Sequence, residues 1–374
     1  MAGIYVHIPF CKSRCIYCDF YSTTDLAIRQ RYIDAVCKEM SMRRDYIRGA
    51  FSTVYIGGGT PSQLEHKQIE KLFDCIYKVF DVEEGAEVTM ECNPDDITPD
   101  FASLLSRLPV NRVSMGAQTF SDLRLKQLRR RHNAAETIRA VSLLRSAGIG
   151  NISIDLMFGF SDETAEEWSN DIRQALSFDV EHISAYSLMY EEGTPLTKML
   201  QSGKIHEIDE ETSRRMYDML VSALTGAGYE HYEISNFARP GMRSRHNSSY
   251  WRHVAYIGLG AAAHSFDLDS RQWNVADISK YIAGAAKGDI PHKREALDDT
   301  TTFNDLITTA LRTSDGISMS LVSARLGKRF HDALTDSSRK YVSSGLMELK
   351  GDRLRLTADG IFVSDMIMSD LMIV

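Results

Sequence analysis

The sequence predicts an α/β protein, a partial (β/α)6 barrel followed by a small C-terminal α+β domain of the winged-helix type. Three observations predict this fold. Six short β-rich runs alternate with helix-like segments over the first two-thirds of the 374 residues, and a polar loop follows five of them. After about residue 300 the alternation gives way to helices and a β-hairpin. A doubly wound parallel sheet fits the alternation equally well.

The predicted strands are short apolar runs, at 3–9, 53–57, 87–91, 112–116, 152–158 and 182–188. Helix-like patterns lie between them, at 27–48, 62–80, 134–147 and 163–176. The third helix ends at Gly148, a residue type that favours a left-handed C-cap, and the fourth opens on the cap candidate Ser161. Alternation implies parallel pairing with right-handed crossovers. The loops after the strands then share one face, where the active sites of such barrels are built.

Composition and charge restrict the class of protein. Hydrophobic residues make up 43% of the chain and charged residues 25%, which supplies a sizeable core, and the length favours two domains. The formal net charge of -8 argues against a general nucleic-acid binder. Residues 300–374 carry nine Lys or Arg and nine Asp or Glu, so the C-terminal domain has no net charge for a phosphate backbone. We expect it to pack on the barrel or dock a protein partner.

The N-terminal run at 3–9 is predicted as a strand rather than a secretory signal. No apolar run approaches the roughly 20 residues that span a bilayer. We therefore expect a cytoplasmic protein. Because that compartment keeps thiols reduced, clustered cysteines there favour metal ligation over disulfides.

Three cysteines lie close together in YVHIPFCKSRCIYCDFY (5–21), spaced C-x3-C-x2-C at Cys11, Cys15 and Cys18. Thiolates hold iron–sulfur clusters, and a [4Fe–4S] cluster normally takes four of them. A zinc ribbon would need two separated C-x2-C pairs, which the sequence lacks. One iron would then have no protein ligand. The other cysteines are expected to be core residues: Cys37, Cys75 and Cys92.

This cysteine loop after a first strand resembles that of the radical S-adenosylmethionine (SAM) superfamily. The resemblance implies a partial (β/α)6 radical-SAM barrel, a [4Fe–4S] cluster on Cys11, Cys15 and Cys18, and SAM on the open iron. In that superfamily, reductive cleavage of SAM yields a 5′-deoxyadenosyl radical. We expect three parts: a barrel over 1–235, a connecting segment with a second motif over 236–299, and the C-terminal domain over 300–374.

The polar loops match the SAM contacts of that superfamily. Glycine in GGGTP (57–61) lets bare backbone approach the methionyl group, and we expect a side chain at Gly59 to block SAM while sparing the cluster. Arg130 is expected to pair with the SAM carboxylate through its planar fork. Judged singly, each carboxylate also fits a solvated strand end. The predicted SAM contacts are Tyr5, Tyr17, Gly58, Gly59, Thr60, Glu91, Gln118, Arg130 and Asp155.

The whole chain resembles the coproporphyrinogen III oxidase-like branch of the superfamily. YVHIPFC, GGGTPS, ECNPD, SMGAQTF and IDLMFG recur there in this order. One member type is the oxygen-independent coproporphyrinogen III dehydrogenase, which decarboxylates two propionates to vinyls in heme synthesis. The other is the HemW-type heme chaperone.

Three features separate the two types. The dehydrogenase usually carries a further cysteine where this chain has Phe20, and an N-terminal extension before the first strand, which here begins almost at Met1. RHNSSYW (245–251) matches the HNxxYW motif that HemW proteins use for heme. All three favour the chaperone, and the dehydrogenase is kept as the alternative.

The HNxxYW match implies a heme site. His246 is the candidate iron contact, because neutral imidazole ligates heme iron, and Tyr250 and Trp251 offer flat apolar surface. Residue chemistry alone favours another role, in which His246 and Asn247 hydrogen-bond a loop against the barrel and the aromatic residues are core, and the family match reverses this preference. The alternative iron ligands are His253 and His264, and the candidate partners of the heme propionates are Arg243, Arg245 and Arg252.

One position departs from the HemW pattern. Members usually read GAGAHS where this chain has GAAAHS, so Ala262 places a methyl group where glycine lets a backbone or a ligand approach.

The resemblance also implies partners: heme, recipient hemoproteins, those of the respiratory chain among them, and a low-potential electron donor. A nucleic acid is not among them. A homodimer and peripheral association with a membrane stay open, as does the question of whether SAM is cleaved during heme transfer.

Overall fold

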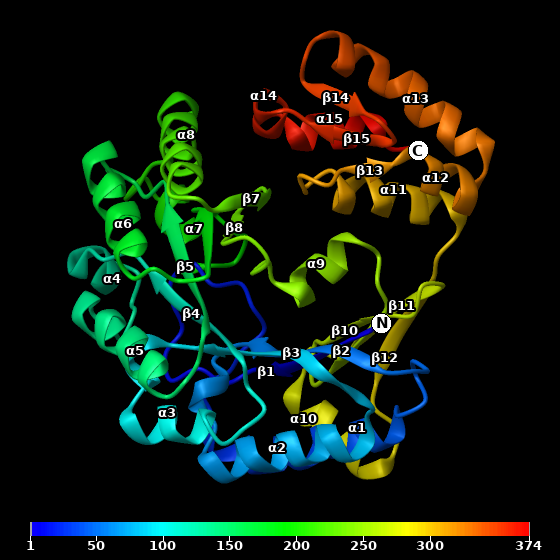
Figure 1. Cartoon of the computed structure of the whole chain (residues 1–374). Helices are drawn as coiled ribbons and strands as arrows, with labels where there is room; N and C mark the ends of the chain where they lie inside the picture. The colour runs from blue at the N-terminus through cyan, green and yellow to red at the C-terminus, as the bar shows by residue number, and fades with distance from the viewer. Residues whose placement is uncertain (1, 374) are drawn as a thin grey trace.

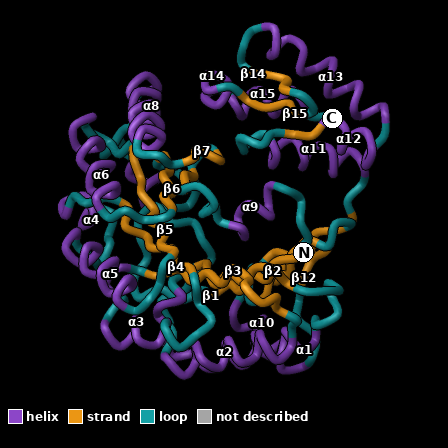
Figure 2. The backbone as a smooth tube through the Cα atoms, viewed as in Figure 1, coloured by secondary structure: helices purple, strands orange, loops and turns teal. Residues whose placement is uncertain are grey.

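The computed structural model describes residues 2–373 of the chain. Its main feature is a curved sheet of twelve strands in the order β12-β11-β10-β9-β1-β2-β3-β4-β5-β6-β8-β7. Helices cover the outer, convex face, whereas α9 (Arg245–Trp251) and the C-terminal domain lie on the inner side (Figure 1). The sheet keeps two edges, β12 and β7, so the barrel is partial. The tube view in Figure 2 shows the same arc of strands around α9.

The centre of the sheet consists of the six predicted strands. Each pairs in parallel with the next, which confirms the predicted α/β barrel topology. The strands are β1 (Ala2–Ile8), β2 (Phe51–Gly58), β3 (Val82–Cys92), β4 (Arg112–Gln118), β5 (Asn151–Phe158) and β6 (His182–Ser187).

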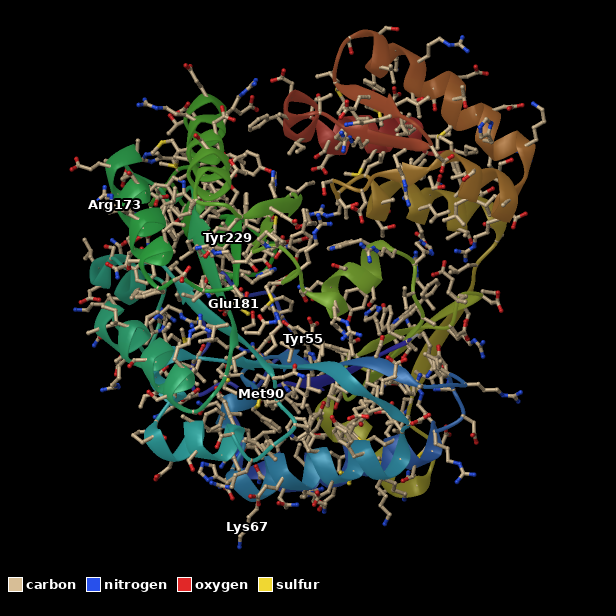
Figure 3. All side chains as sticks on the ribbon, viewed as in Figure 1. Tyr55, Lys67, Met90, Arg173, Glu181 and Tyr229 are labelled. Atoms are coloured by element: carbon tan, nitrogen blue, oxygen red, sulfur yellow. The ribbon has the colours of Figure 1, made fainter. Side chains whose placement is uncertain are left out.

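These strands are buried on both faces, but the two faces differ in chemistry. Met90 of β3 belongs to the apolar core between the sheet and the outer helices. Tyr55 of β2 lies on the inner face of the sheet, and Lys67 of α2 points outward, away from it (Figure 3). Residues two apart on a strand share a face, and those that share the inner face here are largely polar. That face forms the floor of the site.

Four helices confirm the predicted ones with shorter bounds, and several further helices were not predicted. The confirmed helices are α1 (Arg29–Met42), α2 (His66–Val79), α5 (Ala134–Ser146) and α6 (Ala165–Ser177). The additional ones in the barrel are α3 (Pro99–Leu105), α4 (Asp122–Gln127), α7 (Pro195–Gln201), α8 (Glu210–Gly226), and the 3-10 turns Leu26–Ile28, Pro61–Gln63 and Pro94–Asp96.

One of the two predicted helix caps is right and the other is wrong. Gly148 follows α5 with φ +85°, the left-handed conformation expected of a C-cap glycine. The N-cap of α6 is Thr164 rather than Ser161, because Thr164 and Glu167 form a reciprocal capping box that Ser161 cannot form three residues earlier. The hydroxyl of Ser161 instead accepts a hydrogen bond from the backbone N–H of His206.

The segment after β6 extends the sheet at both ends. The strands β7 (Glu230–Glu233) and β8 (Asn236–Ala238) continue from β6, and β8 is antiparallel to it. The other end starts with β9 (Tyr256–Leu259), parallel to β1, and continues through the antiparallel strands β10 (His264–Phe266), β11 (Ser270–Asn274) and β12 (His292–Ala296). The helix α10 (Ile278–Lys287) packs on α1. These strands were not predicted from the sequence, because they are short and several of them are polar.

The C-terminal domain has its own apolar core and a three-stranded sheet in the order β13-β15-β14. This arrangement confirms the predicted winged-helix-like α+β domain. Its elements are α11 (Asp299–Ala310), β13 (Ile317–Ser318), α12 (Met319–Leu326), α13 (Lys328–Ser343), β14 (Met347–Lys350), β15 (Arg353–Leu356), α14 (Ala358–Phe362) and α15 (Ser364–Leu371). Within residues 2–373, no helix combines the length and the apolar character needed to cross a bilayer.

Candidate functional site

A cavity of about 510 Å³ opens at the carboxyl ends of the parallel strands. It brings together the three cysteines of the loop and eight of the nine predicted SAM contacts, from segments that are far apart in the sequence. The predicted residues that line it are Cys11, Cys15, Tyr17, Cys18, Gly58, Gly59, Thr60, Glu91, Gln118, Arg130 and Asp155.

The cysteine loop is held at both ends by backbone hydrogen bonds. The N–H of Cys11 donates to Thr23 O at 2.9 Å, and the N–H of Ile16 donates to Leu128 O at 3.3 Å. In the described part of the chain, no three His, Cys, Asp or Glu side chains converge on a single metal ion. Three thiols of one loop that line the same cavity suit a group that takes several thiolates, such as an iron–sulfur cube.

One neutral donor and one cationic donor face the sulfur atoms. Thr60 Oγ1 donates to Cys11 Sγ at 3.5 Å, and Arg130 Nη1 donates to Cys15 Sγ at 3.5 Å. Burial raises the pKa of Cys18 to about 11, so metal binding has to displace a proton there. Donors aimed at sulfur favour the thiolate form that a cluster requires. The residues present therefore fit an iron–sulfur group.

Arg130 is fixed in place and keeps one free donor. Its Nη2 donates to Asn93 Oδ1 and to Gly116 O, both at 2.7 Å. Its Nε is buried and has no partner among the described residues. A buried donor without a partner is costly, and a ligand carboxylate would satisfy it. Gln118, across the same loop, adopts φ +68°, a conformation that is strained for a residue with a side chain.

Two partly buried carboxylates, those of Glu91 and Asp155, line the cavity. Glu91 accepts hydrogen bonds from the Tyr55 hydroxyl at 2.7 Å and from the Gly58 N–H at 3.0 Å. Burial raises its pKa to about 7 against the opposing effect of these donors. Asp155 accepts from Ser114 Oγ at 3.3 Å, and burial raises its pKa to about 6. Acceptors of this kind can bind ribose hydroxyls or an ammonium group.

The glycines of GGGTP pack against the cluster loop as well as lining the cavity. A Cβ at Gly59 would lie 2.8 Å from Ile8 O and 2.9 Å from the backbone N of Phe10, and one at Gly58 would lie 2.4 Å from the His7 ring. The expectation that a side chain at Gly59 spares the cluster is therefore corrected. Such a side chain would push on the residue next to Cys11.

Tyr5 is the one predicted SAM contact outside the cavity lining. Its hydroxyl shares a hydrogen bond with His7 Nδ1 at 2.9 Å, and His7 Nε2 in turn contacts Tyr21 O at 2.9 Å. Through His7, Tyr5 therefore helps to fix the backbone at Tyr21, just after the cluster loop.

The sequence reading missed Tyr55, Asn93 and Ser114. All three line the cavity, Tyr55 and Ser114 on strands and Asn93 just after β3. Strand alternation carries the signal for Tyr55, because it lies two residues before GGGTP in a run whose inner face is polar.

The HNxxYW motif forms α9, which lies against the inner face of the sheet, and its residues face different ways. Asn247 lines the cavity. His246 is 1% exposed, and its ring stacks on Tyr55 with centroids 5.0 Å apart and planes at 24°. Its Nδ1 shares a hydrogen bond with Thr53 Oγ1 and its Nε2 with the Tyr250 hydroxyl, both at 2.8 Å. Burial, with a contribution from Arg112, lowers its pKa to about 3, so the ring is neutral.

The aromatic residue at the end of the motif faces the C-terminal domain. Trp251 is half-buried under the Arg312 guanidinium, which lies 5.4 Å from the ring centroid. The alternative ligand His253 is half-buried beside Phe266, and His264 is exposed and stacks on Trp273. The four predicted heme contacts therefore do not converge on one point.

The three arginines considered for heme propionates already have partners. Arg243 pairs with Glu230 and Asp315, and Arg252 pairs with the other oxygen of Asp315. Arg245 Nη1 donates to Gly85 O at 3.0 Å.

Comparison with known proteins places this geometry in a family. A model of the radical SAM superfamily matches residues 5–175, and a model of the HemN C-terminal domain matches residues 297–363. The heme chaperone HemW of Bacillus subtilis (strain 168) is 33% identical over 366 residues, which cover 96% of this chain and 96% of that protein. The chain belongs to the HemW family.

Other HemW proteins show the same similarity. The heme chaperone HemW of Escherichia coli (strain K12) is 35% identical over 265 residues, 70% of this chain and 69% of that protein. The solved structure of coproporphyrinogen III oxidase (HemN) from Escherichia coli, a radical SAM enzyme, matches with a TM-score of 0.85 and 21% identity over 99% of this chain and 89% of that one. That match shows a shared fold. As a radical SAM domain, the barrel of this HemW-family chain implies a [4Fe–4S] cluster and SAM.

Proposed function

We propose that this protein is a heme chaperone, which binds heme together with a [4Fe–4S] cluster and SAM and delivers the heme to recipient hemoproteins. The observation that carries the proposal is α9: its HNxxYW sequence stands beside the cysteine-lined cavity, with Asn247 in the cavity wall. The HemW relatives, which match nearly the whole chain, are named heme chaperones.

In this proposal the cavity is the cluster and SAM site. Cys11, Cys15 and Cys18 hold the cluster, which supplies an open iron and a low-potential electron when bound. The free Nε of Arg130 binds the SAM carboxylate, while Glu91 and Asp155 accept hydrogen bonds from its hydroxyl or amino groups. The other predicted contacts that line the cavity would complete the SAM site: Tyr17, Gly58, Gly59, Thr60 and Gln118.

In this proposal heme binds at α9, on His246 with Tyr250 and Trp251, and these side chains have to turn toward one ligand because they do not converge in the structure. Because both ring nitrogens of His246 have hydrogen-bond partners, an iron bond at Nε2 replaces the bond to the Tyr250 hydroxyl. The half-buried position of Trp251 under Arg312 means that the C-terminal domain contributes to the same region. We assign 1–235 to the cofactor barrel, 236–299 to the heme motif and its connections, and 300–374 to the covering domain.

The coproporphyrinogen III dehydrogenase shares this fold, so the fold does not distinguish the two functions. A residue at the cavity mouth does bear on the choice. Phe20 stands there, 65% exposed, where the dehydrogenase usually has another cysteine. An exposed phenyl ring is no metal ligand, and it favours the chaperone.

Heme titration, with product analysis in parallel, tests the proposal. The reconstituted protein should bind about one heme per chain, and His246→Ala should weaken retention and shift the Soret band. His253→Ala, whose ring lies away from the motif's inner face, is the matched control and should do less. Turnover of coproporphyrinogen III with SAM and a reductant, together with heme retention indifferent to His246, would establish the dehydrogenase instead.

The cluster is tested separately. Alanine at Cys11, Cys15 or Cys18 should abolish the brown chromophore of the anaerobically reconstituted protein, whereas alanine at Cys37 should leave it. A triple variant that still holds four irons with an intact cluster spectrum contradicts the ligand assignment.

The partners and compartment complete the proposal. A cytoplasmic setting keeps the thiols reduced for cluster assembly, and a low-potential electron donor serves the cluster. The recipients are hemoproteins, with those of the respiratory chain among them. A homodimer or a peripheral membrane contact would bring the chaperone to such recipients.

A further inference from the structure

One side chain outside the sequence motifs touches both candidate sites. Tyr55 of β2 lines the cavity, and its hydroxyl donates to Glu91 Oε1 at 2.7 Å. Its ring stacks on His246, with centroids 5.0 Å apart. In Figure 3 it lies between the sheet and α9. The same residue therefore contacts a SAM candidate through its hydroxyl and a heme candidate through its ring.

On the SAM side, Tyr55 fixes the orientation of Glu91. The two oxygens of that partly buried carboxylate each have one donor, the Tyr55 hydroxyl and the Gly58 N–H. Without the hydroxyl, Oε1 would lose the only donor that it has among residues 2–373, which is costly. The other charged or titratable groups that face Glu91 are Asp155 of β5, Arg112 of β4, Tyr5 of β1 and Tyr250 of α9.

On the α9 side, the Tyr55 ring helps to hold the His246 imidazole in one position. The imidazole is also bounded by Gly3 of β1, where a Cβ would approach it to 3.1 Å, and is held by Thr53 and Tyr250. A shift of the imidazole toward a ligand requires the Tyr55 ring to move as well, because close-packed rings cannot move independently.

We propose that Tyr55 is a positioning residue that couples the two sites: it holds Glu91 for SAM and seats His246, so that binding at one site changes affinity at the other. Such coupling is reciprocal by thermodynamic necessity. The heme half rests on the proposed function, whereas the SAM half does not depend on it.

The first experiment measures SAM affinity of the cluster-reconstituted protein by calorimetry between about pH 6 and 9. Tyr55→Phe keeps the ring and removes the hydroxyl. It should weaken SAM binding about tenfold near neutral pH, the loss expected for a hydrogen bond to a charged group. Because the carboxylate loses a donor, the midpoint of the pH profile should move to higher pH, and affinity should recover at the alkaline end.

The matched control is Tyr281→Phe. Tyr281 is fully buried, and like Tyr55 it donates its hydroxyl to a carboxylate, Glu39 Oε2, at 2.6 Å. That pair lies between α1 and α10, outside the cavity. The control therefore loses the same kind of bond and should keep the wild-type SAM affinity and pH midpoint.

The second experiment measures heme affinity with and without saturating SAM. In the wild type the two affinities should differ, and in Tyr55→Phe their ratio should approach one. If Tyr55→Phe has the same pH profile of SAM affinity and the same ratio of heme affinities as the wild type, the proposal is wrong. If the wild type binds no heme but Tyr55→Phe still shifts the pH profile of SAM affinity, the proposed heme function is wrong and the role of Tyr55 in the SAM site stands.

A third variant covers the case in which Tyr55→Phe fails to hold its cluster. Glu91→Gln removes the titrating group, so SAM affinity should become weaker and lose its pH-dependent step in this range. A step that persists in Glu91→Gln shows that Glu91 is not the group that Tyr55 positions, and it overturns the proposal.

Discussion

At the residue scale, the most informative positions are those where backbone approaches backbone. Gly59 donates its N–H to Ile8 O at 2.9 Å, and Thr60 donates to Phe10 O at 2.8 Å, so the GGGTP loop is tied to the strand that leads into Cys11. The missing side chain at Gly59 is what permits this contact. The loop thus positions the cluster ligands as well as lining the cavity.

We expect Gly59→Ala to lower both iron content and SAM affinity, since its Cβ would lie under 3.0 Å from two backbone atoms of the cluster-loop strand. Overpacking of this kind costs about 1–3 kcal/mol. Iron analysis and the cluster absorption spectrum after anaerobic reconstitution measure the effect. Gly150→Ala is the control, because a Cβ there meets nothing within 4 Å. Full iron content in Gly59→Ala with normal SAM binding would contradict the steric argument.

Ala262 shows the opposite case, a residue with a side chain where glycine fits better. Its φ of +61° lies in the left-handed region, at the position where HemW proteins usually have glycine. Ala262→Gly should raise the free energy of unfolding by about 0.5–1 kcal/mol, since relief of the left-handed conformation outweighs the added freedom of the unfolded chain. Denaturant unfolding measures it. The control Ala261→Gly, at a fully buried alanine without positive φ, should destabilise the protein.

At the element scale, α9 is a seven-residue helix whose N-terminus is held by a strand. Glu87 of β3 is buried, and its two carboxylate oxygens accept the N–H groups of Arg245 and His246, each at 2.8 Å. A short helix has little stability of its own, so its position depends on contacts of this kind. The carboxylate thereby fixes the start of the HNxxYW motif against the sheet.

We expect Glu87→Gln to loosen α9, because the amide retains one acceptor oxygen and turns a donor toward the second N–H. The loss should be about 2 kcal/mol, the range for hydrogen bonds to charged groups. Hydrogen exchange in the peptide that covers 244–251 should become faster. Glu84→Gln, at an exposed position of the same strand, should leave the exchange unchanged. Equal exchange in both variants would show that Glu87 does not hold the helix.

At the scale of the whole molecule, the C-terminal domain lies over α9 and is tied to it by charge. Asp315 pairs with Arg252 at 2.9 Å and with Arg243 at 3.3 Å, and the N–H of Ser314 donates to Tyr232 O. Although burial opposes it, the hydrogen bond from Arg252 and the charges of both arginines lower the pKa of Asp315. A lowered carboxyl pKa stabilises the docked form above the ordinary Asp value, and this is lost as pH falls through the folded-state pKa.

We expect Asp315→Asn to weaken docking by no more than about 1 kcal/mol, since the carboxylate is partly exposed to solvent. Cleavage in a limited proteolysis assay should increase between β12 and α11, where the domain joins the sheet. Asp336→Asn breaks an exposed pair within α13 and should have no effect. In acid strong enough to protonate Asp315 of the wild type, which requires a pH well below the ordinary pKa of an aspartate because the pKa of Asp315 is lowered, the two proteins should be cleaved at similar rates. A difference that persists in acid would point to another cause.

How much of the fold and site could be predicted from the sequence follows from the range of the interactions involved. The six parallel strands, the hairpin at 347–356 and the cysteine loop are local patterns of period and spacing, and all of them could be predicted. The predicted N-cap of α6 was three residues too early, because Ser161 and Thr164 are both good cap types and the partner Glu167 decides between them. The strands β7–β12 have too few residues and too little alternation to be recognised.

Residue type and spacing alone establish the chemistry of this protein: three thiols at C-x3-C-x2-C, a glycine-rich loop and an HNxxYW segment. How these groups face one another depends on the packed fold. It brings Tyr55 against both Glu91 and His246, turns Asn247 into the cavity and Trp251 toward Arg312, and buries His246 with both nitrogens bonded. Residue type fixes what a side chain can bind, but its partners are often distant in the sequence: Thr53 and His246 are 193 positions apart, and only the packing of α9 on the sheet brings them into contact.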